Sequence, residues 1–199
     1  MKVGVVSAEA PDTTILKIKE RKLLFQQAGV CFDVNWEYLS AIVFVERALF
    51  YDWTDDALDI ILARAGRNSS IGFCQVKIKT AYWIEKQLND PFSKFYPGEK
   101  YRNILKVSES PEELIYKLKN DTLNIYYASA YLRIIQSYWE KAGFPIDNRP
   151  DILGTLYSTG LFYRDRRIRK PNKDPKSNEF GKLVLQYLNS FHLIKRNEK

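Results

Sequence analysis

The sequence contains only one histidine and two cysteines, and this scarcity excludes several kinds of site. His192 is the only histidine, which argues against a serine triad and a multi-histidine metal site. We expect it to be structural. Cys31 and Cys74 are too few for a disulfide scaffold or a four-cysteine zinc site. We therefore expect no metal and no cofactor, so any chemistry must rest largely on carboxylates.

Long apolar runs are also missing. No run approaches the roughly 20 residues that a membrane-spanning helix needs, so we expect no transmembrane segment. The apolar stretch at 3–6 is shorter than the ~7–15 residues of a signal-peptide core. We therefore expect no secretory signal peptide.

Glycine and proline are modest in number, at 9 and 8 of 199 residues, which excludes a collagen-like or low-complexity chain. The length suggests a single domain over 1–199, since domains commonly have roughly 100–200 residues. Apolar residues recur mostly at helical spacing, and strand-like alternation is brief. We predict an all-α fold, with a short β-hairpin near 67–76 as its one extended element.

Caps and periodicity place the helices. We predict helices over about 12–28, 36–50, 78–88, 122–142 and 180–194, one between Thr54 and Gly66, and others beginning at Pro111 and Pro150. In the first of these, Asp12 or Thr13 is the expected cap, and Gly29 is expected to end the helix. The stretch 89–109 is less regular.

Positive charge is concentrated near the C-terminal end. The net charge is +7, and residues 164–176 contain seven Lys or Arg against two Asp. Such a segment attracts polyanions, namely nucleic acid, anionic lipid or cell-wall polymer. The alternative is a solvated basic loop between two helices. No aromatic residues are interleaved in it, so a stacking platform for single strands is not indicated, and we expect no nucleic-acid partner.

One carboxylate breaks the pattern of the helix predicted over 36–50. The apolar face of this helix consists of Leu39, Ile42, Val43 and Phe50. Glu46 has helical spacing to all of them and therefore projects from the apolar face. Desolvation there raises a carboxyl pKa, so the group can keep its proton and act as an acid, as in glycosidases. The alternative is a core-edge Glu paired with Lys or Arg.

Four segments, in order, resemble the lytic transglycosylase domain of the lysozyme-like superfamily. They are 39–46, which resembles the helix that ends in the family's catalytic glutamate; Gly72-Phe73-Cys74-Gln75-Val76 with Thr80-Ala81; Asn124-Ile125 with Tyr131-Leu132; and Leu156-Tyr157-Ser158-Thr159-Gly160. The second is similar to the family's G-L-M-Q-I-x-x-x-T-A signature. The match covers about 35–162. The N-terminal helix, the basic loop and the C-terminal helix are additions to it.

The resemblance implies a function and a set of site residues. Glu46 would be general acid and then base toward the β-1,4 bond between N-acetylmuramic acid (MurNAc) and N-acetylglucosamine (GlcNAc) in peptidoglycan. The sugar's own 6-hydroxyl would attack the anomeric carbon, giving a 1,6-anhydro product. Gln75 and Tyr157 would line the cleft and bind substrate or orient Glu46, and Ser70 is a looser candidate for contacting an N-acetyl group.

The chain also departs from the family. The differing positions are Arg47, Lys77, Ala128 and Ser158. These changes leave a hydrolytic muramidase open, which would need a second, water-activating carboxylate. The acids nearest in sequence are Glu37, Asp55 and Asp56. Cys74 replaces an apolar family residue, so we favour a buried free thiol there over a pair with Cys31.

Two other functions remain open: a module that binds glycan without cutting it, and, less favoured, a nucleic-acid binder acting through 164–176. The expected partner is the peptidoglycan glycan strand of a bacterial wall. Synthesis in the cytoplasm without a signal peptide implies another export or release route to the envelope or periplasm, as for a phage lysin or a delivered toxin. A delivered toxin would need an immunity or inhibitor protein.

Overall fold

The computed structural model describes residues 10–50 and 69–197, and for 49–50 and 190–197 only the backbone. The described part is mostly helical, with one two-stranded antiparallel sheet, so the predicted all-α class with a short hairpin is confirmed. The helix predicted between Thr54 and Gly66 lies outside the described residues, as do Asp55, Asp56 and the side chain of His192.

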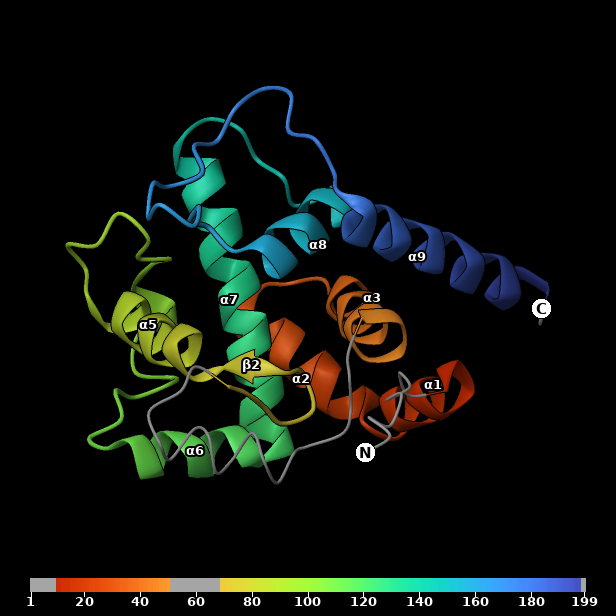
Figure 1. Cartoon of the computed structure of the whole chain (residues 1–199), viewed down its shortest axis with the longest axis horizontal. Helices are drawn as coiled ribbons and strands as arrows, with labels where there is room; N and C mark the ends of the chain where they lie inside the picture. The colour runs from red at the N-terminus through yellow and green to blue at the C-terminus, as the bar shows by residue number, and fades with distance from the viewer. Residues whose placement is uncertain (1–9, 51–68, 198–199) are drawn as a thin grey trace, which may run out of the picture.

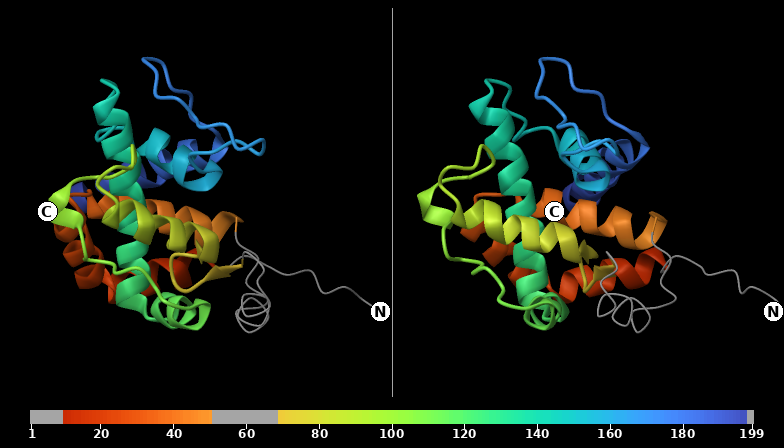
Figure 2. Two further views of the ribbon diagram at one scale, coloured as in Figure 1. Left: turned by 90° about the vertical axis from the view of Figure 1, so that its left-hand side faces the viewer. Right: turned by 60° about the vertical axis from the view of Figure 1, so that its left-hand side comes forward.

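The long helix α7 (Asp121–Lys141) runs through the molecule, and the other helices surround it (Figure 1). The elements are α1 (Pro11–Glu20), α2 (Lys22–Phe32), α3 (Trp36–Val45), the π-helical turn η1 (Glu46–Phe50), β1 (Ser70–Ile71), β2 (Val76–Lys77), α5 (Ile78–Asn89), the 3-10 turn η2 (Glu99–Tyr101), α6 (Pro111–Lys119), α7, α8 (Pro150–Thr159) and α9 (Glu179–Asn197). Helices α2, α3, α5, α6 and α8 all contact α7. Figure 2 shows α7 from two further sides.

The N-terminal helix differs from the prediction. It is two helices, α1 and α2, which meet at Arg21, and Ala10 is its N-cap in place of Asp12 or Thr13. The expectation that Gly29 ends the helix is wrong, because α2 continues to Phe32. A Cβ at Gly29 would lie 2.8 Å from the Val34 carbonyl oxygen, so the glycine permits a close approach of the chain that leads into α3.

Two helix starts follow the cap chemistry of the sequence. The Asn35 side chain accepts the Glu37 backbone N–H at 2.9 Å and so starts α3. The Ser110 side chain accepts the Glu113 backbone N–H at 3.2 Å and so starts α6. Local side-chain chemistry thus fixes the beginnings of two helices, one of which, α3, leads to Glu46.

The hairpin predicted near 67–76 is present. Ser70 pairs with Lys77 and Ile71 with Val76, and a tight turn joins the two strands. Gly72 begins this turn with φ +77°, and a Cβ there would lie 2.3 Å from the Leu118 carbonyl oxygen. Only glycine fits at this position, because other residues would be strained and would clash with the Leu118 carbonyl of α6 and the Asn124 side chain.

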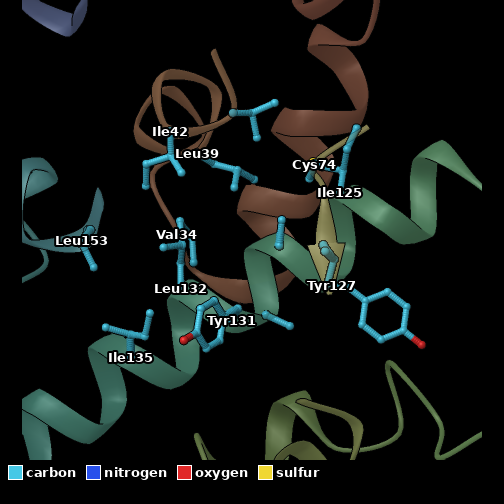
Figure 3. Packing of buried hydrophobic residues seen from close by; sticks show 14 of the residues in the cluster. Val34, Leu39, Ile42, Cys74, Ile125, Tyr127, Tyr131, Leu132, Ile135 and Leu153 are labelled. Atoms are coloured by element: carbon cyan, nitrogen blue, oxygen red, sulfur yellow. The ribbon is translucent and has the colours of Figure 1, made fainter. Parts of the chain in front are cut away.

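The core lies around α7, between it and the helices α2, α3, α5, α6 and α8. Figure 3 shows Leu39 and Ile42 of α3, Ile125, Leu132 and Ile135 of α7, and Leu153 of α8, with Cys74 at its edge. All of these residues are buried. Helix α9 packs against α3 and α8 and then extends from the body toward the C-terminus (Figure 1). None of the described helices is both long and apolar enough to span a membrane.

Candidate active site

A pocket of about 250 Å³ opens where four parts of the chain converge: the end of α3, the hairpin with the start of α5, the middle of α7, and the end of α8. Residues from each part line it: Glu46; Gln75, Lys77 and Thr80; Ala128 and Tyr131; and Tyr157, Ser158 and Gly160. Three of the four site residues expected from sequence, namely Glu46, Gln75 and Tyr157, therefore share one pocket. The fourth, Ser70, lies in β1 opposite Lys77 and is not among the lining residues.

Glu46 sits at the point where the backbone widens from α3 into the π-helical turn η1. Such turns are frequent at functional sites, since they reorient side chains at the end of a regular helix. The Glu46 side chain is half-buried and, within the described part of the chain, has no hydrogen bond or ion pair. Burial raises the pKa of its carboxyl, and the nearby charge of Lys77 partly opposes this rise. The carboxyl therefore holds its proton closer to neutral pH than an ordinary glutamate does.

Gln75 occupies the turn between β1 and β2 in a left-handed conformation, with φ 53°. Its Nε2 donates to the Gly72 carbonyl oxygen at 2.9 Å and so closes the turn. Its Oε1 is buried, and no hydrogen-bond donor among the described residues reaches it. A left-handed non-glycine residue and an unsatisfied buried carbonyl each cost roughly 1–3 kcal/mol. A strained polar residue in a pocket wall is typical of a position kept for a ligand.

Tyr157 connects α8 to the same turn. Its hydroxyl donates to the Cys74 carbonyl oxygen at 3.0 Å, and its ring centroid lies 5.8 Å from that of Tyr131. Burial raises the pKa of Tyr157 well above its ordinary value, and negative charge at Glu46 would raise it further. The hydroxyl therefore stays protonated and serves as a fixed donor that ties the two walls of the pocket together.

Two buried side chains hold the turn that carries Gln75. The Asn124 side chain accepts from the Cys74 N–H at 2.6 Å and donates to the carbonyl oxygens of Ile71 and Leu118 at 2.9 Å each. Arg47 donates from Nη1 to the Phe73 carbonyl oxygen at 2.9 Å. Its guanidinium also lies 4.4 Å over the Phe73 ring.

Arg47 therefore explains one departure from the family pattern. Arg47 is buried, with 3% of its surface exposed. It directly follows Glu46 in the chain, and its hydrogen bond to Phe73 connects this region to the turn that carries Gln75. Sequence reasoning treated Arg47 only as an unusual neighbour of the glutamate. The distance in sequence between Arg47 and Phe73 hid this contact.

The second carboxylate that a muramidase would need is not found among the described residues that line the pocket, where Glu46 is the only acid. Glu37 lies nine residues earlier in the first turn of α3, which is about 13 Å along a helix axis. It lines a different, apolar pocket between α1, α3 and α9. Asp55 and Asp56 lie outside the described residues.

Other pocket residues were not singled out as site candidates by the sequence. Lys77 was noted only as a departure from the family, yet it lines the pocket beside Glu46. Tyr131 stands in a matched motif, and burial raises its pKa to about 12. Ala128 and Tyr131 are three residues apart on one helix and so share a face. This spacing was the sequence signal that both side chains would lie on the same wall of the pocket.

The two cysteines play no part in the pocket chemistry. Both thiols are free, and Cys74 is buried, as predicted. Burial raises the pKa of the Cys74 thiol far above its ordinary value, so it does not supply a thiolate. Among residues 10–50 and 69–197, no group of three or more His, Cys, Asp or Glu side chains is arranged to hold a metal ion.

In comparisons with known proteins, no family model matches the sequence, and no curated protein matches it significantly. Function must therefore be inferred from the pocket residues and from the motifs that resemble lytic transglycosylases.

Proposed function

We propose that this protein is a lysozyme-like enzyme that cleaves the MurNAc–GlcNAc β-1,4 bond of peptidoglycan, with Glu46 as general acid and base. The observation that carries the proposal is one carboxyl group: Glu46 is half-buried, has no partner among the described residues, and lines a pocket with Gln75 and Tyr157. A carboxyl with a raised pKa beside a pocket is the arrangement that protonates a leaving glycosidic oxygen.

The proposed reaction needs no second carboxylate. Glu46 donates its proton to the glycosidic oxygen as the bond from that oxygen to the muramyl C1 breaks. The muramyl 6-hydroxyl then attacks C1, and the ionised Glu46 takes the hydroxyl proton, which restores the acid. The products are a 1,6-anhydromuramyl end and a free GlcNAc 4-hydroxyl. The presence of Glu46 as the single acid among the described lining residues favours this course over hydrolysis.

Neighbouring residues would assist in different ways. The Gln75 amide would offer hydrogen bonds to sugar hydroxyl or N-acetyl groups, and Tyr157 would hold the turn that presents this amide. Ser70 remains a prediction as a contact for an N-acetyl group, from a position outside the pocket lining. No metal or cofactor enters the proposed reaction.

Lys77 favours the alternative of a module that binds glycan without cleaving it. Its positive charge lowers the pKa of Glu46 and so favours the ionised carboxylate, which cannot donate a proton. Burial of Glu46 is the larger influence and acts in the opposite direction. The balance favours an enzyme, and the alternative predicts tight glycan binding without turnover.

Digestion of purified peptidoglycan sacculi tests the proposal, with mass spectrometry of the soluble products. The wild type should release anhydro-muropeptides, and Glu46→Gln should lower the rate by at least about 10²–10⁴-fold. Glu37→Gln is the matched control, because it alters a carboxylate of the same helix that faces another pocket, and it should keep wild-type activity.

Other products would lead to different conclusions. Reducing-end muropeptides would identify a muramidase and direct attention to acids beyond the described residues. If neither the wild type nor Glu37→Gln releases products while both bind sacculi and are folded, the protein is a binding module and the enzymatic proposal is wrong.

A further inference from the structure

The first part of the basic segment, residues 164–168, lies in a small hairpin. Residues 162–168, here called the basic hairpin, begin and end in an isolated antiparallel bridge. The Tyr163 N–H donates to the Arg167 carbonyl oxygen at 2.8 Å, and the Arg166 N–H donates to the Tyr163 carbonyl oxygen at 2.9 Å. Arg166, at φ 67°, completes a tight turn. Its backbone therefore presents the charged side chains from a defined position.

The basic hairpin is anchored to the body of the protein by aromatic contacts. The Phe162 ring centroid lies 5.9 Å from that of Trp83 and 5.8 Å from that of Phe95. Behind it, the Arg169 N–H donates to the Leu161 carbonyl oxygen at 2.8 Å. These contacts fix the hairpin against α5 and the loop that follows it.

The basic hairpin also adjoins the candidate active site. Gly160, two residues before it, lines the pocket with Ser158. Arg169, just after it, donates from Nε to the Gly160 carbonyl oxygen at 3.0 Å. A glycan strand that is bound in the pocket and extends past Gly160 would therefore reach the basic hairpin next.

Two of the hairpin arginines carry uncompensated charge. Arg164 and Arg166 are exposed, and neither has an ion pair or hydrogen bond from its side chain within the described ranges. Arg167, by contrast, is paired with Asp165 at 2.6 Å. Positive charge without a partner inside the protein, beside a binding pocket, suits an anionic group of the ligand.

We propose that Arg164 and Arg166 of the basic hairpin bind carboxylates of the stem peptides that branch from the glycan strand held in the pocket. This inference rests on the proposed function. In a peptide-bearing strand the sugars carry no charge, because the lactyl carboxyl of each MurNAc is amide-linked to its stem peptide, so unpaired arginines next to the pocket fit the charged peptide branch of the same polymer. Arginine also matches carboxylate geometry, since its guanidinium can donate two parallel hydrogen bonds.

A nucleic-acid partner fits the same surface less well. The Arg169 guanidinium lies 4.0 Å over the Tyr163 ring, so this exposed aromatic already has a cation on its face. Nucleic acid is therefore retained only as an outcome of the test.

The test compares two forms of one ligand. Solubilised, uncross-linked glycan strands are prepared with their stem peptides and, separately, after an amidase has removed the peptides and the freed lactyl carboxylates of MurNAc have been converted to amides, so that the stripped strands are uncharged. Binding is measured in the Glu46→Gln background, which prevents turnover, with and without Arg164→Gln/Arg166→Gln. The control is Lys106→Gln/Lys119→Gln, which removes two exposed charges near α6, at the other end of α7 (Figures 1 and 2).

We expect the arginine pair to strengthen binding of the peptide-bearing strands by about three- to ten-fold at low salt, an effect that fades as salt rises. Arg164→Gln/Arg166→Gln should weaken binding of peptide-bearing strands by this factor and leave binding of stripped strands unchanged. The lysine control should bind both strand forms as tightly as the Glu46→Gln parent. Equal losses on both strand forms, or no loss, would overturn the inference. So would a duplex DNA that binds more tightly than the strands and depends on the same arginines.

The proposed function can fail separately. If the wild type cleaves both strand forms but the arginine variants show no selective loss, only the hairpin inference is wrong. If the wild type neither binds nor cleaves either form, both proposals are wrong.

Discussion

Glu46 and Glu85 are both carboxylates set into apolar helix surfaces, yet their surroundings are opposite. Glu85 of α5 is fully buried, and its carboxylate has hydrogen-bond donors and a positive charge as partners. The Ser108 N–H and hydroxyl donate to it at 2.8 and 2.7 Å, the Tyr127 hydroxyl donates to it, and Lys117 Nζ lies 3.5 Å away. Glu46 is half-buried beside the pocket and has no such partner within the described chain.

On the proposed function, this difference separates a structural carboxylate from a reactive one. A buried charge whose lone pairs are all occupied stabilises one arrangement of the chain and offers nothing to a ligand. A carboxyl that burial has made less acidic, with free lone pairs and a pocket in front, is available to exchange a proton. The comparison predicts that changes at Glu85 affect folding, whereas changes around Glu46 affect activity.

The largest expected effect is on stability. Glu85→Ala should lower the free energy of unfolding by about 3–5 kcal/mol, because it leaves Ser108, Tyr127 and Lys117 without their shared acceptor. Glu46→Ala should change it by about 1 kcal/mol or less. Urea unfolding followed by circular dichroism measures both. Similar losses for the two variants would remove the distinction between the two carboxylates.

The next effect concerns two buried glutamines. Gln75 and Gln136 each have a buried Oε1 without a donor among the described residues, but only Gln75 lines the pocket. Gln75→Leu should lower the rate of sacculus digestion by about ten-fold or more, since a hydrogen bond to the substrate is lost. Gln136→Leu should leave the rate unchanged. Equal activity of the two variants would show that the Gln75 amide only closes its turn.

A smaller effect tests the charge state of Glu46 in the folded protein. Burial raises its pKa above the unfolded value, so the native state holds this proton more tightly than the unfolded state does. Stability therefore falls as pH rises from the unfolded pKa through the folded one. Glu46→Gln removes this loss and should be as stable as wild type at pH 4 and slightly more stable at pH 7.5. A variant less stable at the higher pH would contradict a raised pKa.

The smallest effect should come from Lys77. Its charge lowers the pKa of Glu46, so Lys77→Met should raise that pKa. Since the reaction needs a protonated Glu46, the alkaline limb of the pH–rate profile should move to higher pH in this variant. Lys106→Met, a change of the same kind at an exposed position away from the pocket, should leave the profile in place. A shift toward lower pH would show that Lys77 does not act through the charge on Glu46.

Sequence patterns predicted much of the fold because they report local physics. The caps at Asn35 and Ser110, the hairpin near 67–76 and the long helix now seen as α7 all depend on neighbours within a few residues. The expectation that proved wrong for a helix end had a non-local cause. Gly29 was expected to end a helix, but it instead admits a close contact with Val34 and the start of α3.

The candidate site was predictable to the extent that its residues carry local signals. Glu46 stood out because it interrupts an apolar helix face, while Gln75 and Tyr157 entered only through motif resemblance. Lys77 and Arg47 stood out in the sequence as unusual residues, but the sequence did not indicate where their side chains lie or what they contact. Their roles depend on contacts with segments more than twenty residues away, which no periodicity reports.

The sequence by itself determined that this chain is helical, that Glu46 projects from an apolar helix face, and that residues 164–176 carry most of the excess positive charge. These properties follow from composition and from spacing along one helix or loop. Only the tertiary structure decided that Glu46, Lys77 and Tyr157 meet in one pocket and that the first residues of the basic segment lie in a hairpin beside it. The physical reason is that packing around α7, rather than any local preference, brings these distant segments together.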